Sequence, residues 1–360
     1  MLHYCDKNVT AKLAESTWYA LFLAGAMLVA ATAARAEPSP CASNLRAESS
    51  SATDPSTAGA AAQTRASQTQ MAAAPGATDR GPADRQPPPD TVRTVSTVLA
   101  GVPAILRIPA TIQKPPIVLW HGLGPPSSEA ELMKDLPLDD VPAVKIYLGL
   151  PLFGARAPVA GTDSLAQRQA QDYATRIFAP IVVGAANELP AVLNEMTKSG
   201  CLRAGEKIGL FGFSAGGTAA LIALMDNKAP ISVAVTVNAP SGLRSAVGAL
   251  ERATKQPYAW SDASLRLAER SDATLHAIQI AATAAGQPRA LLLFQGADDN
   301  MISPADTVSL DRSLRPVYQH SHDPHRLQLT VATGVSHDWA DPKTVGQVRS
   351  AVADWFNRYL

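Results

Sequence analysis

The sequence predicts an α/β protein in which a mostly parallel sheet carries helices on both faces. Short apolar runs typical of buried strands alternate with longer helical stretches along the C-terminal three quarters of the chain, and parallel sheets produce this alternation. The predicted strands span 94–99, 104–108, 117–120, 143–148, 207–211, 231–237, 290–294 and 327–331. The predicted helices span 165–198, 215–225, 304–314 and 342–359, and the first is expected to break near Pro180.

Several of these elements have local signals at their ends. The first two strands flank Gly101-Val102-Pro103, which predicts an antiparallel hairpin. The strand 117–120 is apolar throughout and leads directly into His121-Gly122-Leu123-Gly124. Ser303 and Asp341 each precede a proline that suits a first helical turn, so both are predicted helix N-caps.

Residues 239–287 interrupt the alternation with helical but weakly patterned sequence. An insertion between late strands lies above the carboxyl edge of the sheet, where open α/β folds bind ligands. The insertion is therefore a candidate lid or rim of a substrate site. A lateral pair of packing helices explains the same pattern equally well.

The N-terminal quarter differs from the rest of the chain. Residues 18–34 contain no charge, and Ala34-Arg35-Ala36 has the small-x-small pattern of a signal-peptidase site. We interpret 1–36 as a signal peptide, with an uncleaved anchor formed by residues 18–34 as the alternative. Residues 37–93 contain few large aliphatic side chains and are predicted to be a disordered tether. The folded domain is then expected over 94–360.

Charge and cysteine content narrow the partners and the compartment. The chain has 31 Lys and Arg against 31 Asp and Glu, and this balance predicts neither nucleic acid nor an anionic membrane as a partner. A cleaved signal implies a periplasmic or secreted protein without stable membrane association. Cys41 and Cys201 are able to pair in an oxidising compartment, but that bond would tie the tether to the core. We therefore expect two free thiols.

A serine lies at a strand, turn and helix junction. Gly212-Phe213-Ser214-Ala215-Gly216 follows the apolar run 208–211 and precedes the small and apolar residues 217–225. A serine hydroxyl becomes an effective nucleophile when it is exposed near a base and near backbone donors. Glycines on both sides of the serine let strand and helix approach closely. Ser214 is therefore the candidate nucleophile, and a glycine-rich turn without chemistry is the alternative.

With this junction, residues 94–360 resemble the α/β-hydrolase family, in which serine, acid and histidine follow one another along the chain, each after a strand. The segment Gln295-Gly296-Ala297-Asp298-Asp299-Asn300-Met301-Ile302-Ser303-Pro304 is similar to the acid loop of that family. The resemblance places Asp299 on the acid, and a shift of one residue would select Asp298. Gly334-Val335-Ser336-His337 is similar to the histidine loop.

The roles implied by this resemblance agree with acyl-transfer chemistry. His337 would accept the proton of Ser214, while Asp299 would fix the imidazole tautomer and stabilise the imidazolium. Asp338 is a poor acid because a neighbour in sequence seldom points its carboxylate at the Nδ1 atom of the preceding histidine.

An oxyanion needs two backbone donors. The first is expected to be the N–H of Ala215, which follows the nucleophile at the start of a helix, where the helix dipole also favours negative charge. The resemblance implies the N–H of Leu123 as the second. His121 is expected to brace this loop, with a proton-carrying role as the alternative.

Metal binding is not expected. His320, His322 and His325 cluster around Asp323, but their spacing matches no reliable zinc signature. The cluster is interpreted as a solvated loop before a strand.

The sequence as a whole predicts an exported serine hydrolase that cleaves a small-molecule carboxylic ester through an acyl-enzyme, with no cofactor. An ester is preferred because no peptide-gating domain is recognisable in the sequence. The resemblance also includes dienelactone-hydrolase-like and prolyl-oligopeptidase-like activities, so an amide or peptide hydrolase is the runner-up. A catalytically silent binding protein is the third hypothesis. Phe213, Trp339 and Phe153 lie near the site in sequence but define no substrate pocket.

Overall fold

The structure is a computed structural model that describes residue 41 and residues 92–159, 161–282, 286–339 and 341–360. The predicted signal peptide and nearly all of the predicted tether lie outside these residues.

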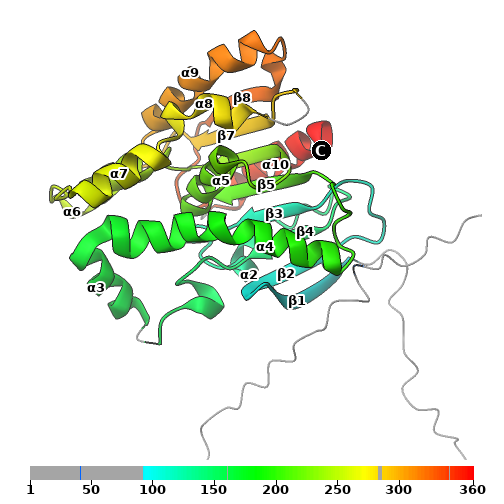
Figure 1. The fold of residues 1–360 in the computed structure, drawn as a ribbon, viewed down its shortest axis with the longest axis horizontal. Helices are drawn as coiled ribbons and strands as arrows, with labels where there is room; N and C mark the ends of the chain where they lie inside the picture. Colours follow the sequence, from blue (N-terminus) through cyan, green and yellow to red (C-terminus); the bar gives the residue numbers. More distant parts are fainter. Residues whose placement is uncertain (1–40, 42–91, 160, 283–285, 340) are drawn as a thin grey trace, which may run out of the picture. The chain divides into compact units, whose positions relative to one another are not determined.

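The described chain forms one eight-stranded sheet with the strand order β1-β2-β4-β3-β5-β6-β7-β8 (Figure 1). The strands are β1 (Arg93–Leu99), β2 (Val102–Ile108), β3 (Ile117–Trp120), β4 (Lys145–Leu148), β5 (Ile208–Phe213), β6 (Ile231–Val237), β7 (Ala290–Gly296) and β8 (Leu327–Ala332). β2 is antiparallel to both of its neighbours, and all pairs from β4 to β8 are parallel. The carboxyl ends of the parallel strands therefore meet along one edge.

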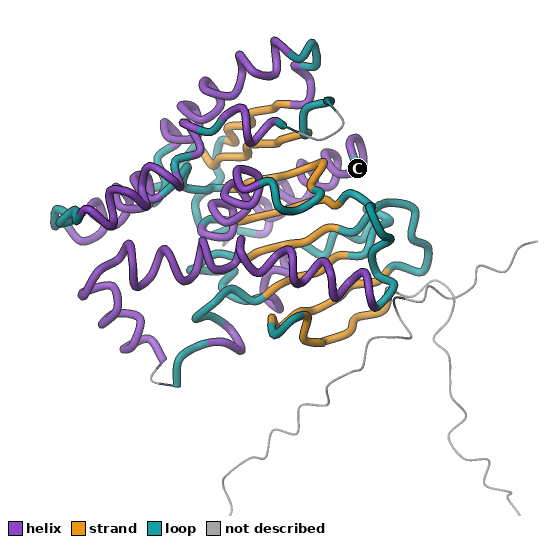
Figure 2. Tube along the Cα trace, viewed as in Figure 1, coloured by secondary structure: helices purple, strands orange, loops and turns teal. Residues whose placement is uncertain are grey.

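Helices cover both faces of the sheet, which confirms the predicted fold class (Figure 2). The helical elements are α2 (Glu129–Asp135), η1 (Gly154–Arg156), α3 (Gly161–Tyr173), η2 (Ala174–Val183), α4 (Gly184–Lys198), α5 (Ala215–Asp226), α6 (Leu243–Thr254), α7 (Asp262–Ser271), η3 (Ala273–Leu275), α8 (Ala277–Ala281), α9 (Pro304–His320), η4 (Pro324–Arg326) and α10 (Pro342–Tyr359). One core cluster contains side chains of η2, α4, α5, α8 and α9. The opposite cluster contains side chains of α2 and α10.

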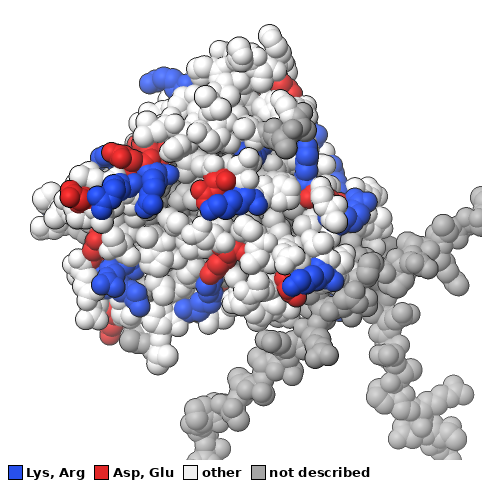
Figure 3. All heavy atoms as spheres, viewed as in Figure 1, with Lys and Arg blue, Asp and Glu red and all other residues white. Residues whose placement is uncertain are grey.

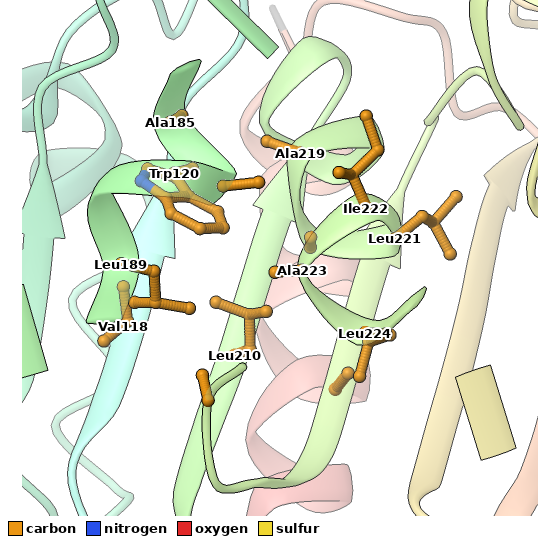
Figure 4. Packing of buried hydrophobic residues seen from close by; sticks show 14 of the residues in the cluster. Val118, Trp120, Ala185, Leu189, Leu210, Ala219, Leu221, Ile222, Ala223 and Leu224 are labelled. Carbon is orange, nitrogen blue, oxygen red and sulfur yellow. The ribbon is translucent and has the colours of Figure 1, made fainter. Parts of the chain in front are cut away.

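The central part of the core joins β3 and β5 to two helices. Trp120 of β3 and Leu210 of β5 lie under α4 and α5, and the contact surface of α5 includes Ala219 and Ala223 (Figure 4). Small side chains let a helix approach the sheet closely. The helical segment Asp163–Lys198 is long and apolar enough to cross a membrane by composition, but half of its most apolar window is buried inside the protein.

The first predicted helix breaks at a different residue from the one expected. Asp172, with φ −170° and ψ 109°, breaks the helical path one residue before the end of α3, whereas Pro180 lies inside the π-helical η2. The Asp172 carboxylate accepts hydrogen bonds from the N–H of Ala174 (3.0 Å) and the hydroxyl of Thr175 (2.7 Å). An aspartate that caps the following helix explains the break, and a π-helical segment relaxes the i→i−4 bonding that proline interrupts.

Two other elements differ from the prediction. Helix α9 continues past Leu314 to His320 and includes Pro316. Helix α2 was not predicted, although Ser128 caps it by accepting a hydrogen bond from the N–H of Glu131 at 3.2 Å. The predicted N-caps Ser303 and Asp341 do accept hydrogen bonds from the N–H groups of Ala305 and Lys343.

Cys41 and Cys201 form a disulfide, with a Cα–Cα distance of 4.3 Å. The expectation of two free thiols is therefore wrong. Cys41 is fully buried and belongs to the same core cluster as the side chains of α4. The prediction failed because the composition around Cys41 shows no apolar pattern that would place this residue in the core.

Charged side chains of both signs are interspersed over the face of the molecule in Figure 3. This distribution agrees with the net charge of 0.

Candidate active site

Ser214 lies at the sharp turn between β5 and α5. Its backbone is strained, with φ 51° and ψ −120°, a conformation that side-chain-bearing residues seldom adopt. A Cβ atom on Gly212 would come within 2.2 Å of the Gly216 carbonyl oxygen, and one on Gly216 within 2.4 Å of the His121 carbonyl oxygen. Both glycines are therefore required for the close approach that presents the Ser214 side chain above the sheet.

The structure brings the three predicted triad residues together from loops far apart in sequence. The Nε2 atom of His337 lies 3.1 Å from the Oγ atom of Ser214, and its Nδ1 atom lies 2.8 Å from Oδ2 of Asp299. All three residues are at most 9% exposed. This is the arrangement in which an imidazole accepts a hydroxyl proton while a carboxylate holds its other nitrogen.

Other donors hold the Asp299 carboxylate in place. Its Oδ1 atom accepts hydrogen bonds from the N–H groups of Met301 (2.9 Å) and Ile302 (2.8 Å). The side-chain N–H of Gln295 donates to Oδ2 at 3.1 Å, and the hydroxyl of Thr307 donates to the side-chain oxygen Oε1 of Gln295 at 2.8 Å. Both carboxylate oxygens are thus held before any substrate binds.

The two competing aspartates do not contact the imidazole. Asp298 is exposed, and its carboxylate has no partner among the described residues. The Asp338 carboxylate accepts a hydrogen bond from the hydroxyl of Ser336 at 2.9 Å. In the described chain, only Asp299 is positioned to orient His337.

The two predicted oxyanion donors, Leu123 and Ala215, line the same cavity as Ser214 and His337. Neither of their N–H groups has a hydrogen-bond partner in the part of the chain that the structure describes. By contrast, the neighbouring N–H of Gly122 is already bonded to the Pro126 carbonyl oxygen at 3.1 Å. The two predicted donors are therefore unpaired in residues that line the cavity together with the serine, and an oxyanion site needs such donors.

His121 braces the loop after β3, as one of its two predicted roles requires. Its ring is fully buried; Nδ1 donates to the Gly122 carbonyl oxygen at 2.7 Å, and Nε2 accepts a hydrogen bond from the N–H of Leu150 at 3.1 Å. Burial lowers the pKa of His121 to about 4, because a low-dielectric site disfavours the charged imidazolium. Both nitrogens are engaged, so the ring links two loops and carries no mobile proton.

Asn238 is a positioning residue that the sequence did not reveal. It is fully buried just after β6, with φ 48°. Its side-chain amide donates to the carbonyl oxygens of Ser336 (3.0 Å) and His337 (3.3 Å), and its own side-chain oxygen accepts from the N–H of Gly296 (2.7 Å). One side chain therefore connects the histidine loop to the end of β7, which carries the acid loop. An asparagine after a strand has no distinctive pattern, so no sequence signal pointed to this role.

A cavity of about 630 Å³ opens on Ser214 and His337. Its apolar lining includes Phe178 and Val182 of η2, Ala246 and Leu250 of α6, and Ile302 of the acid loop. Figure 1 shows α3, α6 and α7 gathered at the same end of the sheet. The insertion thus forms a rim through α6, while α8 packs laterally against α5 and α9.

The aromatic residues near the site support the catalytic loops. The ring of Phe213 lies 5.4 Å from that of His337 and 4.5 Å from that of Trp339, between ring centres. Phe153 contacts His121 edge-on at 6.4 Å. None of these three rings lines the cavity.

His320 ends α9, His322 lies in the following turn, and His325 lies in η4. Among the described residues, these histidines form no group of three potential ligands able to hold a metal ion.

Comparisons with known proteins agree with this geometry. The profile of the prolyl oligopeptidase family matches residues 183–360, a stretch that contains Ser214, Asp299 and His337. No curated protein matches the sequence. The crystal structure of TT1662 from Thermus thermophilus is similar with a TM-score of 0.54 and 20% identity, over 74% of this chain and 98% of that chain. Dipeptidyl peptidase 4 from Porphyromonas gingivalis is similar with a TM-score of 0.52 and 13% identity, over 75% of this chain and 36% of that chain.

The burial of His121 predicts a loss of stability in acid. Its pKa of about 4 in the folded protein lies below the ordinary value of 6.5, so the unfolded chain binds the proton more readily. The stabilising contribution is complete above pH 6.5 and is lost as pH falls towards 4, by about 3 kcal/mol in total. Urea unfolding at pH 7.5 and pH 4.5 should show a smaller difference for His121→Gln than for the wild type. The exposed His325→Gln is the control, and equal pH dependence in all three proteins would contradict the assignment.

Replacing Asn238 by Asp should slow turnover. The variant has nearly the same volume, but its carboxylate cannot donate to the two carbonyl oxygens of the histidine loop and is repelled by them. We expect kcat per active serine to fall about tenfold or more, with KM within about twofold, because small displacements of catalytic groups are costly.

The matched control for this substitution is Asn227→Asp. Asn227 follows the end of α5 and, like Asn238, has a left-handed backbone conformation, with φ 51°. Its side-chain oxygen accepts a hydrogen bond from Arg289, away from the site. A similar loss of kcat in both variants would show that Asn238 supports folding and does not position His337. A loss of activity that disappears when the rate is divided by the concentration of active serines would show the same.

Proposed function

We propose that this chain, a serine hydrolase of the α/β-hydrolase fold, cleaves carboxylic esters through an acyl-enzyme intermediate. The observation that carries the proposal is the hydrogen-bonded series from Ser214 through His337 to Asp299, of which Ser214 and His337 line a cavity. A serine that is activated in this way attacks an acyl carbon placed in that cavity.

The mechanism follows from the contacts. His337 removes the proton from Ser214 as the oxygen attacks the carbonyl carbon, and then gives that proton to the departing alcohol. Asp299 holds the Nδ1–H of His337 and stabilises the imidazolium. The N–H groups of Leu123 and Ala215 stabilise the oxyanion, aided by the positive end of the α5 dipole. Water, activated by the same imidazole, then releases the acid.

The lining of the cavity favours an ester over a peptide that is recognised by its free amino terminus. A bound ammonium group needs a carboxylate or several acceptors nearby, because an unpaired charge in a cavity is costly. Among the described residues that line the cavity, none is Asp or Glu. An ester also has the better leaving group, since an amide nitrogen departs only after protonation.

An amide or peptide substrate is the second candidate. The match to the prolyl oligopeptidase family supports it, because the matched residues include the whole triad. Matched 4-nitrophenyl ester and 4-nitroanilide substrates with the same acyl group separate the two proposals. If the enzyme accelerates hydrolysis of the anilide more than hydrolysis of the ester, each relative to its uncatalysed rate, the amide or peptide substrate is favoured.

A fluorophosphonate probe should label the wild-type protein and should fail to label Ser214→Ala. 4-Nitrophenyl acetate should give a burst equal to the amount of active protein. Asp299→Asn should reduce kcat by about 10³- to 10⁴-fold, because the wrong tautomer is then held towards the serine. The control, Asp298→Asn, should retain most of the activity. A folded wild-type protein without label or burst would overturn the enzyme proposal and leave the catalytically silent binding protein.

We also propose that the protein is exported to a periplasmic or extracellular location. The uncharged stretch 18–34 and the site after Ala36 support this, and the disulfide between Cys41 and Cys201 suits an oxidising compartment. N-terminal sequencing of protein from the native compartment should begin at Glu37. Thiol titration of that protein, denatured without reductant, should find neither cysteine free. A retained Met1, or two titratable thiols, would contradict export with cleavage.

A further inference from the structure

The charged side chains on the cavity wall are all basic. Arg252 and Lys255, from the C-terminal end of α6, line the cavity that opens on Ser214. No Asp or Glu is present among the described lining residues. The chain as a whole has equal numbers of basic and acidic residues, whereas the two charged residues at the cavity, both of them exposed, are basic.

Arg252 is held in place at the wall of the cavity. Its guanidinium donates to the carbonyl oxygen of Met301 at 2.7 Å, and the N–H of Met301 in turn donates to the Asp299 carboxylate. The cation therefore sits on the loop that carries the catalytic acid. In the described part of the chain, Arg252 forms no ion pair. Its remaining N–H donors are available to a ligand, and a guanidinium presents them in a geometry that suits carboxylates.

Two further donors belong to the same cavity. Lys255, which ends α6 in a left-handed conformation with φ 58°, has no side-chain partner among the described residues. Tyr173, at the end of α3, also lines the cavity, and its hydroxyl has no hydrogen-bond partner among the described residues. Burial raises the pKa of Tyr173 to about 12, so its hydroxyl remains a neutral donor at physiological pH. Cations and a phenol hydroxyl suit a ligand that accepts hydrogen bonds.

We propose that the ester substrate carries an anionic group, in the simplest case a carboxylate, which Arg252 binds at the cavity wall with Lys255 and Tyr173 as further donors. This inference rests on the proposed ester hydrolysis and specifies its substrate class. The apolar side chains of η2 and α6 contact the carbon chain between the ester and the anionic group. The substrate is thus an ester with an apolar spacer and a charged end.

The test uses two matched ester pairs, one for each side of the ester bond. Mono(4-nitrophenyl) adipate and 4-nitrophenyl hexanoate differ by a carboxylate in the acyl part. 4-Carboxyphenyl butyrate and phenyl butyrate differ by a carboxylate in the alcohol part. The quantity measured is the ratio of kcat/KM for the anionic ester to that for the neutral ester. A comparison of this ratio between wild type and variants removes the intrinsic reactivity of each substrate.

In at least one pair, Arg252→Gln should lower this ratio by about fivefold, as expected for one partly exposed ion pair. Arg252→Lys, which keeps the charge, should retain part of the preference, and Tyr173→Phe should lower the ratio by a smaller factor. Raising the salt concentration should lower the ratio in the wild type because exposed charges are screened.

The matched control is Arg244→Gln. Arg244 is an exposed arginine on the same helix that stacks on Trp260 at 5.3 Å and does not line the cavity. Its substitution should leave the ratio unchanged. If Arg252 only connects α6 to the acid loop, Arg252→Gln changes kcat/KM for the anionic and the neutral ester by the same factor. The ratio then stays constant, and this result overturns the anionic-substrate proposal but not the proposed ester hydrolysis. Failure of the wild type to hydrolyse any of the four esters would overturn the proposed ester hydrolysis itself.

Discussion

The close approach of three backbone segments around Ser214 is the constraint on which the site depends. The end of β5, the start of α5 and the loop after β3 come together with no room for a Cβ atom at Gly212 or Gly216. This contact forces the strained conformation of Ser214 and places its side chain at the carboxyl edge of the sheet. It also brings the N–H groups of Leu123 and Ala215 to the cavity that contains the serine. The strain is sustained by the buried strands and helices on either side.

The acid and the histidine depend on a second set of contacts, which is made of hydrogen bonds. Asp299 is held by backbone N–H groups and by Gln295, while Asn238 connects the histidine loop to the end of β7. These polar groups are buried, so each lost partner would leave an unsatisfied donor or acceptor at a substantial cost. The network therefore favours one arrangement of the two loops. A preorganised imidazole avoids reorganisation when the proton moves.

The insertion after β6 supplies part of the cavity wall. Helix α6 contributes an apolar surface and two basic side chains to the cavity, whereas α8 only packs against other helices. The triad loops lie at the carboxyl edge of the sheet, and α6 is joined to them where Arg252 donates to the carbonyl oxygen of Met301.

Local patterns were sufficient to predict the fold class and the strands, whereas Asp299 and His337 were placed by resemblance to the α/β-hydrolase family. The strand 231–237, the helix start at Pro304 and the glycines around Ser214 are each determined by neighbours in sequence, through apolar runs, caps and backbone sterics. What the sequence could not provide was contact between distant residues. The break at Asp172, the pairing of Cys41 with Cys201, the bridging role of Asn238 and the position of Arg252 beside Met301 all depend on partners that local patterns cannot identify. The chain by itself determined which chemistry is available, because residue type and local backbone shape decide that. Only the tertiary structure decided which groups meet, because burial and hydrogen bonding across the sheet edge depend on the whole fold.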